Sequence, residues 1–193
     1  GLPELHANTH DIYQRGKPLV ILVSPHVGFI QYIHTRVPGH PVSGYHRDRR
    51  METSAARNPG RTAIVCNGRK LSFGWLKDRS DALAHCLADA GAKRGSRIGL
   101  MCRRTPDMLA SLFAIMKTGG AYVPMLSDYP AERIRYIAQN SGMSLLLCDE
   151  SAKGALPEGL SCTVVSMSEA DREERKNFIP PAGRCSEDLI YIL

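Results

Sequence analysis

Met116-Lys-Thr-Gly-Gly-Ala-Tyr-Val-Pro124, continued by Met125-Leu-Ser-Asp-Tyr-Pro-Ala-Glu-Arg-Ile134, is the stretch that decides the fold of this chain. An amphipathic helical pattern ends at the paired glycines, a short apolar strand follows, and Pro130 opens another helix. The Gly119-Gly120 pair leads into a strand, whereas a phosphate-binding loop leads into the N-terminus of a helix. We therefore interpret the pair as a helix stop with close packing.

Strands and helices are predicted to alternate on both sides of this stretch. Apolar runs predict strands at residues 62–66, 70–73, 97–102, 121–124, 145–148 and 162–165, with a last apolar run at 188–193. Helices are expected at 51–58, from Ser72 to about Ala90, after Thr105-Pro106, and from Pro130 to Gly142, whereas residues 150–159 have the composition of a loop. The alternation predicts an α/β domain with a mostly parallel sheet flanked by helices.

The helix that follows Ser72 has an asymmetric pattern. One face carries its apolar side chains, namely Leu76, Leu83, Cys86, Leu87 and Ala90. Four charged residues lie towards the other side, where we expect solvent: Lys77, Asp78, Arg79 and Asp81.

Residues 1–49 differ from the rest of the chain, and we interpret them as a linker or poorly defined N-terminal segment. Two apolar runs, 19–23 and 29–33, predict short strands, and the prolines and glycines of 38–44 predict turns. Six of the seven histidines fall here: His6, His10, His26, His34, His40 and His46. The i,i+4 spacing of His6 and His10 suits a metal pair on a helix, but Pro3 and Asn8 disfavour that helix, so we expect exposed histidines.

Composition excludes several classes of protein. The net charge of +6 is spread out, and its arginine clusters lack interleaved aromatic residues, so nucleic-acid binding is not expected. Six dispersed cysteines without a C-x-x-C pair predict free thiols in a reducing compartment, hence a cytoplasmic protein. The early apolar run, residues 18–33, is too short and interrupted to span a bilayer, and no secretory leader is apparent.

No catalytic constellation is recognisable. The chain has no G-x-G-x-x-G, G-x-x-x-x-G-K-[ST], G-x-S-x-G or H-E-x-x-H motif. His85 has Asp81 and Asp89 one turn away, and we interpret it as a helix-surface histidine. Asp128 and Tyr129 lie at a strand-to-helix junction, where we expect capping of the next helix. We therefore predict no catalytic, cofactor-binding or metal-binding residue.

Three groups of residues resemble the adenylation domain of nonribosomal peptide synthetases, within the adenylate-forming (AMP-dependent synthetase and ligase) superfamily. Ala55-Ala-Arg-Asn-Pro59 with Ala63-Ile-Val65 is similar to the usual opening, and Leu71-Ser-Phe-Gly-Trp-Leu76 resembles the first core motif. The stretch from Met116 to Ile134 resembles the second core motif, because Gly-Gly, Tyr-Val-Pro and Asp-Tyr-Pro-Ala-Glu-Arg occur together in it. Two departures are Trp75 in the first motif and Met125-Leu-Ser127 where the family usually has an aspartate soon after Val-Pro.

The resemblance covers residues 50–193 and implies activation of an amino acid with ATP and Mg²⁺ to an aminoacyl-adenylate. The acyl group would then pass to the phosphopantetheine thiol of a carrier protein, with a condensation domain upstream. The family's phosphate loop, specificity pocket and C-terminal lysine would all lie beyond Leu193. We therefore expect the N-terminal portion of an adenylation domain that is inactive alone.

Two further expectations follow from the resemblance. The isolated chain should be marginally stable or aggregation-prone, because its last strand would lack neighbours. The alternative to an incomplete enzyme is a non-catalytic interaction module that retains part of the fold.

Overall fold

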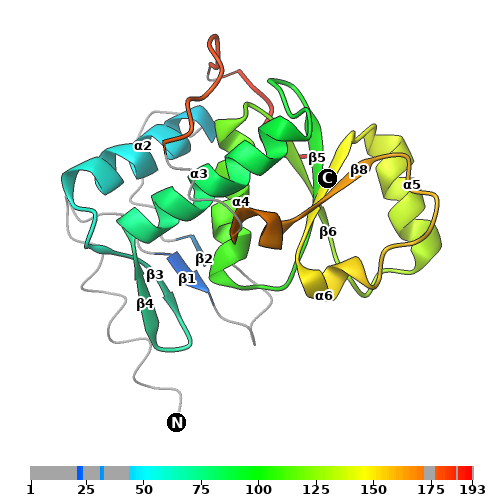
Figure 1. Cartoon of the computed structure of the whole chain (residues 1–193), viewed down its shortest axis with the longest axis horizontal. Coiled ribbons are helices and arrows are strands. Elements are labelled where there is room, and N and C mark those ends of the chain that lie inside the picture. Colours follow the sequence, from blue (N-terminus) through cyan, green and yellow to red (C-terminus); the bar gives the residue numbers. More distant parts are fainter. Residues whose placement is uncertain (1–20, 24–30, 33–43, 172–176, 186, 193) are drawn as a thin grey trace.

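Two four-stranded sheets organise the chain in the computed structural model, which describes residues 21–23, 31–32, 44–171, 177–185 and 187–192 (Figure 1). The first sheet has the order β2-β1-β3-β4 and the second the order β6-β5-β7-β8. The strands are β1 (Ile21–Val23), β2 (Gln31–Tyr32), β3 (Thr62–Cys66), β4 (Arg69–Ser72), β5 (Arg97–Met101), β6 (Ala121–Met125), β7 (Leu145–Cys148) and β8 (Thr163–Ser166). The helices are α2 (Gly44–Arg57), α3 (Phe73–Asp89), α4 (Pro106–Lys117), α5 (Ala131–Ser141), α6 (Glu150–Lys153) and the 3₁₀ helix η2 (Met167–Asp171).

The first sheet is mixed. β3 and β4 form the predicted hairpin, in which Asn67 and Gly68 have φ of 49° and 75°, as a tight turn between twisted strands requires. β1 pairs with β3 in parallel and with β2 in antiparallel orientation. β1 and β2 fall inside the predicted runs 19–23 and 29–33, whose other residues lie outside the described part of the chain.

The second sheet is entirely parallel and is covered on both faces (Figure 1). Leu145 and Leu147 of β7 pack in the core formed with α3 and α4, whereas Leu146 and Cys148 pack on the opposite face with α5. Successive strand residues point to opposite faces, so a strand buried on both sides is apolar throughout. The predicted α/β class with a mostly parallel sheet is confirmed.

Most predicted helix boundaries are present. The Ser72 Oγ accepts a hydrogen bond of 3.1 Å from the Trp75 N–H and caps α3. Pro106 occupies the first turn of α4, although the Thr105 side chain in front of it makes no capping hydrogen bond. Gly119 follows α4 with φ of 76°, and Gly142 ends α5 with φ of 61°. Both glycines adopt the left-handed conformation that stops a helix.

Three predicted segments differ in the structure. The helix expected from Met51 begins earlier, at Gly44. The expected loop at 150–159 begins with α6, because the Asp149 carboxylate accepts the Ala152 N–H and caps a helical turn. The last apolar run contributes one parallel bridge, between Tyr122 and Tyr191, at the free edge of β6.

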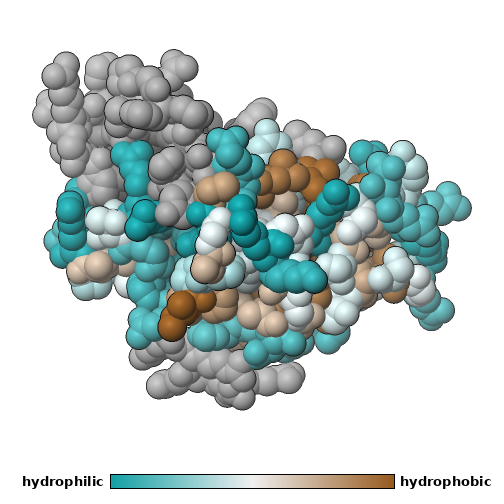
Figure 2. Space-filling model, turned by 90° about the horizontal axis from the view of Figure 1, so that it is seen from above, coloured by the Kyte–Doolittle hydropathy of each residue, from teal (hydrophilic) through white to brown (hydrophobic). Residues whose placement is uncertain are grey.

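Apolar surface is distributed in separate patches among hydrophilic side chains on the face that Figure 2 presents. Within the described part of the chain, the large apolar side chains that are exposed are Leu126, Tyr136, Ile179, Leu189 and Tyr191. Among the described residues, no helix combines the length and apolar character that crossing a membrane requires.

Candidate functional site at the carboxyl edge of the parallel sheet

The carboxyl ends of β5, β6, β7 and β8 meet at one edge of the parallel sheet. Open α/β sheets bind ligands outside this edge, so the side chains that follow these strands are the first candidates for a site. Arg103 follows β5, Asp149 and Glu150 follow β7, and Ser166 ends β8.

The charged groups after β5 and β7 bind one another. The Arg103 N–H and Nε donate to the Asp149 Oδ2 at 2.9 and 3.3 Å. The Asp149 Oδ1 accepts from the Ser151 Oγ at 2.6 Å and from the Ala152 N–H at 2.8 Å. Partial burial opposes ionisation of Asp149, but the hydrogen bonds from Ser151, Arg103 and Ala152 outweigh it and hold the pKa below its usual value. Asp149 is therefore an ionised capping residue, not a proton donor at neutral pH.

Glu150 is also engaged within the fold. Its Oε1 accepts hydrogen bonds from the Ser166 and Ser168 hydroxyls, the second at 2.7 Å. The Ser166 N–H donates to the neighbouring Glu169 at 3.2 Å. The bonds to Glu150 connect the end of β8 to the start of α6. Both serine hydroxyls donate to a carboxylate with a structural role, and among the residues that the structure describes neither is bonded to a histidine or lysine that would activate a serine as a nucleophile.

Two thiols near this edge are inactive as nucleophiles. Burial raises the pKa of Cys102 to about 12, and the negative charges of Asp149 and Asp107 add to the effect. Burial likewise raises the pKa of Cys148 to about 11. The thiolate is the reactive form, so both groups stay protonated and unreactive at neutral pH. They pack as small apolar side chains, Cys148 within the core and Cys102 half-buried against it.

The described residues do not fit a metal or nucleotide-phosphate site. Within the described ranges, no three His, Cys, Asp or Glu side chains are grouped as metal ligands. Gly119 and Gly120 end α4 and pack tightly, since a Cβ on Gly120 would lie 3.0 Å from Ile98 Cδ1. They are therefore a helix stop, as predicted, and we derive no step through ATP or Mg²⁺ from these residues.

A groove of about 420 Å³ lies at the opposite, amino edge of β5 and β6. It is lined by Arg94, Gly95, Arg97, Gly119, Ala121, Asp188 and Leu189. The Arg94 guanidinium is held by Asp188 at 2.7 Å, and the Arg97 Nη1 donates to the Ser141 carbonyl at 2.7 Å. The two arginines are thus engaged in holding the fold together.

The remaining residues of interest from the sequence do not assemble into a site. His85 is half-buried on α3 and makes an edge contact with Phe178, with ring centroids 5.1 Å apart. Asp128 is exposed and does not cap α5, whose N-cap position is Pro130 without a side-chain hydrogen bond. The Arg133 guanidinium stacks over the Tyr129 ring at 4.3 Å. His6 and His10 lie outside the described residues.

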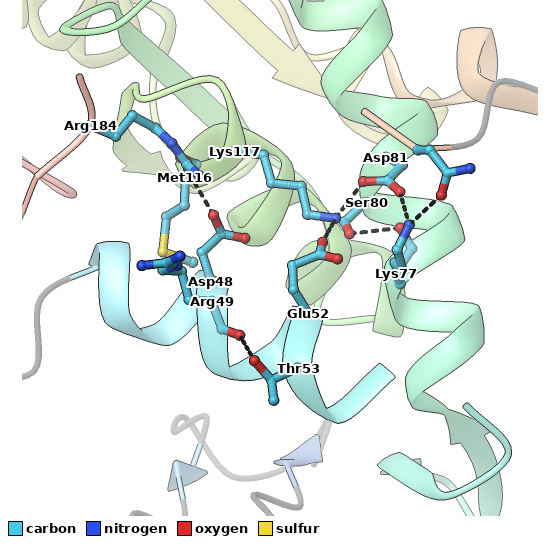
Figure 3. Close-up of polar contacts among 11 residues, drawn as sticks. Asp48, Arg49, Glu52, Thr53, Lys77, Ser80, Asp81, Met116, Lys117 and Arg184 are labelled. Carbon is cyan, nitrogen blue, oxygen red and sulfur yellow. Dashed lines mark hydrogen bonds and ion pairs between the residues drawn. The ribbon is translucent and has the colours of Figure 1, made fainter. Parts of the chain in front are cut away.

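Sequence reasoning missed a buried ionic cluster between helices (Figure 3). The Lys117 Nζ, at the end of α4, lies 2.5 Å from both Asp81 of α3 and Glu52 of α2. Lys77 donates to Asp81 at 2.6 Å, and Lys117 and Asp81 are each 1% exposed. The prediction that Asp81 faces solvent was wrong, because α2 and α4 pack on that side of α3. The i,i+4 spacing of Lys77 and Asp81 was the local signal of this pairing.

A second buried pair joins α2 to the C-terminal region. The Arg184 Nη1 donates to the Asp48 Oδ2 at 2.6 Å and to the Met116 carbonyl at 3.0 Å. Asp48 is 1% exposed, and its Oδ1 has no hydrogen-bond partner among the described residues. Within each cluster the charged groups pair with partners on other elements. The first cluster joins α2, α3 and α4, and the second joins Arg184 to α2 and α4, so both have a structural role.

Sequence comparison identifies the family. Residues 51–193 match the profile described as AMP-binding enzyme. Gramicidin S synthase 2 of Brevibacillus brevis is 32% identical over 143 residues, which is 74% of this chain and 3% of that protein. Bacitracin synthase 3 of Bacillus licheniformis is 42% identical over 97 residues, which is 50% of this chain and 2% of that protein. The chain thus spans a small part of these relatives.

Structural comparison agrees on the fold. The N-terminal subdomain of Klebsiella oxytoca NpsA superposes with a TM-score of 0.64 at 24% identity, covering 74% of this chain and 36% of that one. The nonribosomal peptide synthetase FmoA3 in its AMPPNP-bound form superposes with a TM-score of 0.69 at 20% identity, covering 81% and 17%. Taken with the family match, these similarities show that the chain belongs to the AMP-binding enzyme family and corresponds to the N-terminal part of a nonribosomal peptide synthetase adenylation domain.

Proposed function

We propose that this chain supplies the N-terminal part of an adenylation domain that, when complete, activates an amino acid with ATP and Mg²⁺ and releases pyrophosphate. The observation that carries the proposal is the family match over residues 51–193, which includes the whole parallel sheet and the helices that cover it. Similarity to gramicidin S and bacitracin synthases supports an amino acid as the substrate class.

The division of the chain is part of the same proposal. Residues 1–49 serve as a linker-like segment and residues 50–193 as the adenylation portion, with the phosphate loop outside it. The start of the family match at residue 51 supports this division, while α2 crosses it. The partners are the rest of the adenylation domain, a carrier protein and a condensation domain. Six free cysteines support a cytoplasmic location.

Amino-acid-dependent ATP–pyrophosphate exchange tests the proposal. A polypeptide of these 193 residues should give no exchange with any of the twenty amino acids, because the proposal assigns the phosphate loop to a part of the domain outside residues 50–193. A chimera that carries this chain in place of the matching segment of gramicidin S synthase 2 should regain exchange. The recipient without any such segment is the control.

The outcomes separate the two functional classes. Exchange by the 193-residue chain alone would contradict its predicted inactivity. A chimera that folds but shows no exchange would contradict the proposal of an adenylation part. Tight association of the chain with a complementary fragment, without restored activity, would favour the non-catalytic interaction module.

A further inference from the structure

The C-terminal region contacts α3, α2 and the end of α4 before it reaches the sheet. We refer to its described residues, 177–185 and 187–192, as the strap. The strap begins beside α3, where Asn177 accepts a hydrogen bond from Lys77 at 3.0 Å. It ends at β6, where the Tyr122 N–H donates to the Ile190 carbonyl at 2.9 Å and the Ile192 N–H donates to the Tyr122 carbonyl at 3.0 Å. The strap thus adds a parallel neighbour to the free edge of β6.

One polar anchor of the strap is deeply buried. Arg184 is bonded to Asp48 and to the Met116 carbonyl, and the side chains of Arg184 and Asp48 are 11% and 1% exposed (Figure 3). The same guanidinium therefore contacts α2 through Asp48 and the end of α4 through Met116. A second ion pair of the strap, Arg94 with Asp188, is more exposed, with 44% of the Arg94 side chain and 20% of the Asp188 side chain accessible. An exposed pair constrains the chain weakly, whereas a buried pair admits few alternative arrangements.

The buried pair is poorly explained as a source of stability. Burial raises the pKa of Asp48 despite the opposing effect of Arg184, so desolvation outweighs the attraction between the two groups. The Asp48 Oδ1, which lacks a hydrogen-bond partner in the described part of the chain, adds to this cost. Replacing a buried ion pair with well-packed apolar groups is often neutral or stabilising, so net stability does not account for this pair.

We propose that Asp48 and Arg184 form a positioning latch that holds residues 190–192 in register on β6. Because the added segment runs parallel to β6, it leads the chain towards the carboxyl edge of the sheet. The latch thereby sets where residues 190–192 approach the edge at which α/β proteins bind ligands. Asp48 lies ahead of the family match, so α2 contributes to the domain from outside the matched residues. The link to activity rests on the proposed function; the positioning itself does not.

Hydrogen exchange of the 193-residue chain, resolved to single amides, tests the latch. In Arg184→Met the Tyr122 and Ile192 amides should exchange roughly tenfold or more faster than in the unaltered chain. The matched control is Arg79→Met, because Arg79 resembles Arg184 in burial and in its kinds of partner. Its side chain is 16% exposed, and it binds the carboxylates of Asp107 and Asp171 and the main-chain carbonyl of Met167. These partners of Arg79 all lie outside the strap. The Arg79→Met variant should therefore leave the exchange rates of the Tyr122 and Ile192 amides unchanged relative to those of the β5 and β7 amides.

Three results would overturn the latch. They are equal acceleration in the two variants, no acceleration in Arg184→Met, and unprotected Tyr122 and Ile192 amides in the unaltered chain. The double variant Asp48→Leu/Arg184→Met guards against simple unfolding, since it removes both charges; its core should stay protected while the strap amides exchange fast.

The consequence for activity is measured in the chimera. There Arg184→Met should lower the kcat of pyrophosphate exchange more than Arg79→Met does, and Arg184→Lys should restore part of it. Equal activity of the Arg184→Met and Arg79→Met chimeras would overturn the functional half of the inference. An inactive unaltered chimera would instead contradict the proposed function, and the exchange experiment on the 193-residue chain would still decide the latch.

Discussion

At the scale of single residues, the buried charges depend on complete pairing. Lys117 and Asp81 are each 1% exposed and lie 2.5 Å apart. Removing one partner of such a pair leaves the other charge buried without compensation, whereas replacing both with apolar groups avoids that penalty.

Asp81→Asn should therefore lower the free energy of unfolding by up to about 3–5 kcal/mol, because Lys117 loses its buried counter-charge and keeps the half-exposed Glu52. Urea denaturation followed by Trp75 fluorescence measures the loss. The control is Arg103→Met, which removes an exposed partner of Asp149 and should cost less than about 1 kcal/mol. The double variant Lys117→Met/Asp81→Leu should recover much of the loss; a double variant worse than the sum of the single changes would contradict this account.

Backbone conformation makes a second residue-scale prediction. Gly119 has φ of 76°, and an added Cβ would lie 3.1 Å from Arg94 Cα. Gly119→Ala should cost about 1–2 kcal/mol or more of unfolding free energy, because a side chain disfavours the left-handed conformation. Gly154 has φ of −70° and open space around it, so Gly154→Ala should raise stability by about 0.4–1 kcal/mol. Equal effects of the two changes, measured by urea denaturation, would disprove this explanation.

The buried thiols predict how stability changes with pH. Burial raises the pKa of Cys148 to about 11, so between the unfolded value near 9.0 and 11 the unfolded thiol loses its proton while the folded one keeps it. The unfolded state then binds fewer protons, and stability falls as pH rises through this window. Cys148→Ala should flatten that fall in unfolding free energy between about pH 8 and 10.5. A Cys162→Ala control should flatten it less, because that thiol is only half-buried whereas Cys148 is fully buried. An unchanged slope in Cys148→Ala would rule out this thiol as the cause.

At the scale of elements, the start of each helix depends on different groups. Ser72 caps α3 with its hydroxyl, whereas Thr105 occupies the same position before α4 without a side-chain hydrogen bond. The two residue types predict similar caps. Because the Thr105 side chain makes no capping hydrogen bond, Pro106 and Asp107 in the first turn define the start of α4.

Ser72→Ala should consequently lower the unfolding free energy by about 1 kcal/mol, and Thr105→Ala should change it by a few tenths at most. Thermal unfolding of both variants under one buffer condition measures the difference. A loss at Thr105 as large as that at Ser72 would show that its hydroxyl caps α4 in solution.

At the scale of the whole molecule, the strap leaves apolar side chains in solvent. Leu189 and Tyr191 are 59% and 47% exposed beside the edge of β6. Unpaired sheet edges and adjacent apolar surface promote association. The chain should therefore show concentration-dependent association in sedimentation experiments.

Leu189→Ser should reduce that association, because it removes the more exposed of these two side chains. Leu156→Ser, at a half-buried position beyond α6, is the control and should not reduce it. A sharp melting transition of a monomer that is independent of concentration would contradict the prediction.

The sequence alone determined most elements of this protein, the parallel class of the sheet formed by β5, β6, β7 and β8, and its family. Those signals are local: Asn67-Gly68 sets a hairpin turn, Ser72 caps a helix, and Gly119 and Gly142 stop two others within a few residues. Only the tertiary structure decided that Asp81 is buried against Lys117 and that Asp48 binds Arg184. The first two residues are 36 positions apart in the sequence and the second two are 136 positions apart, so no local pattern pairs them. Charge alone does not say whether a helix face meets water or another helix; that depends on how α2, α3 and α4 pack together.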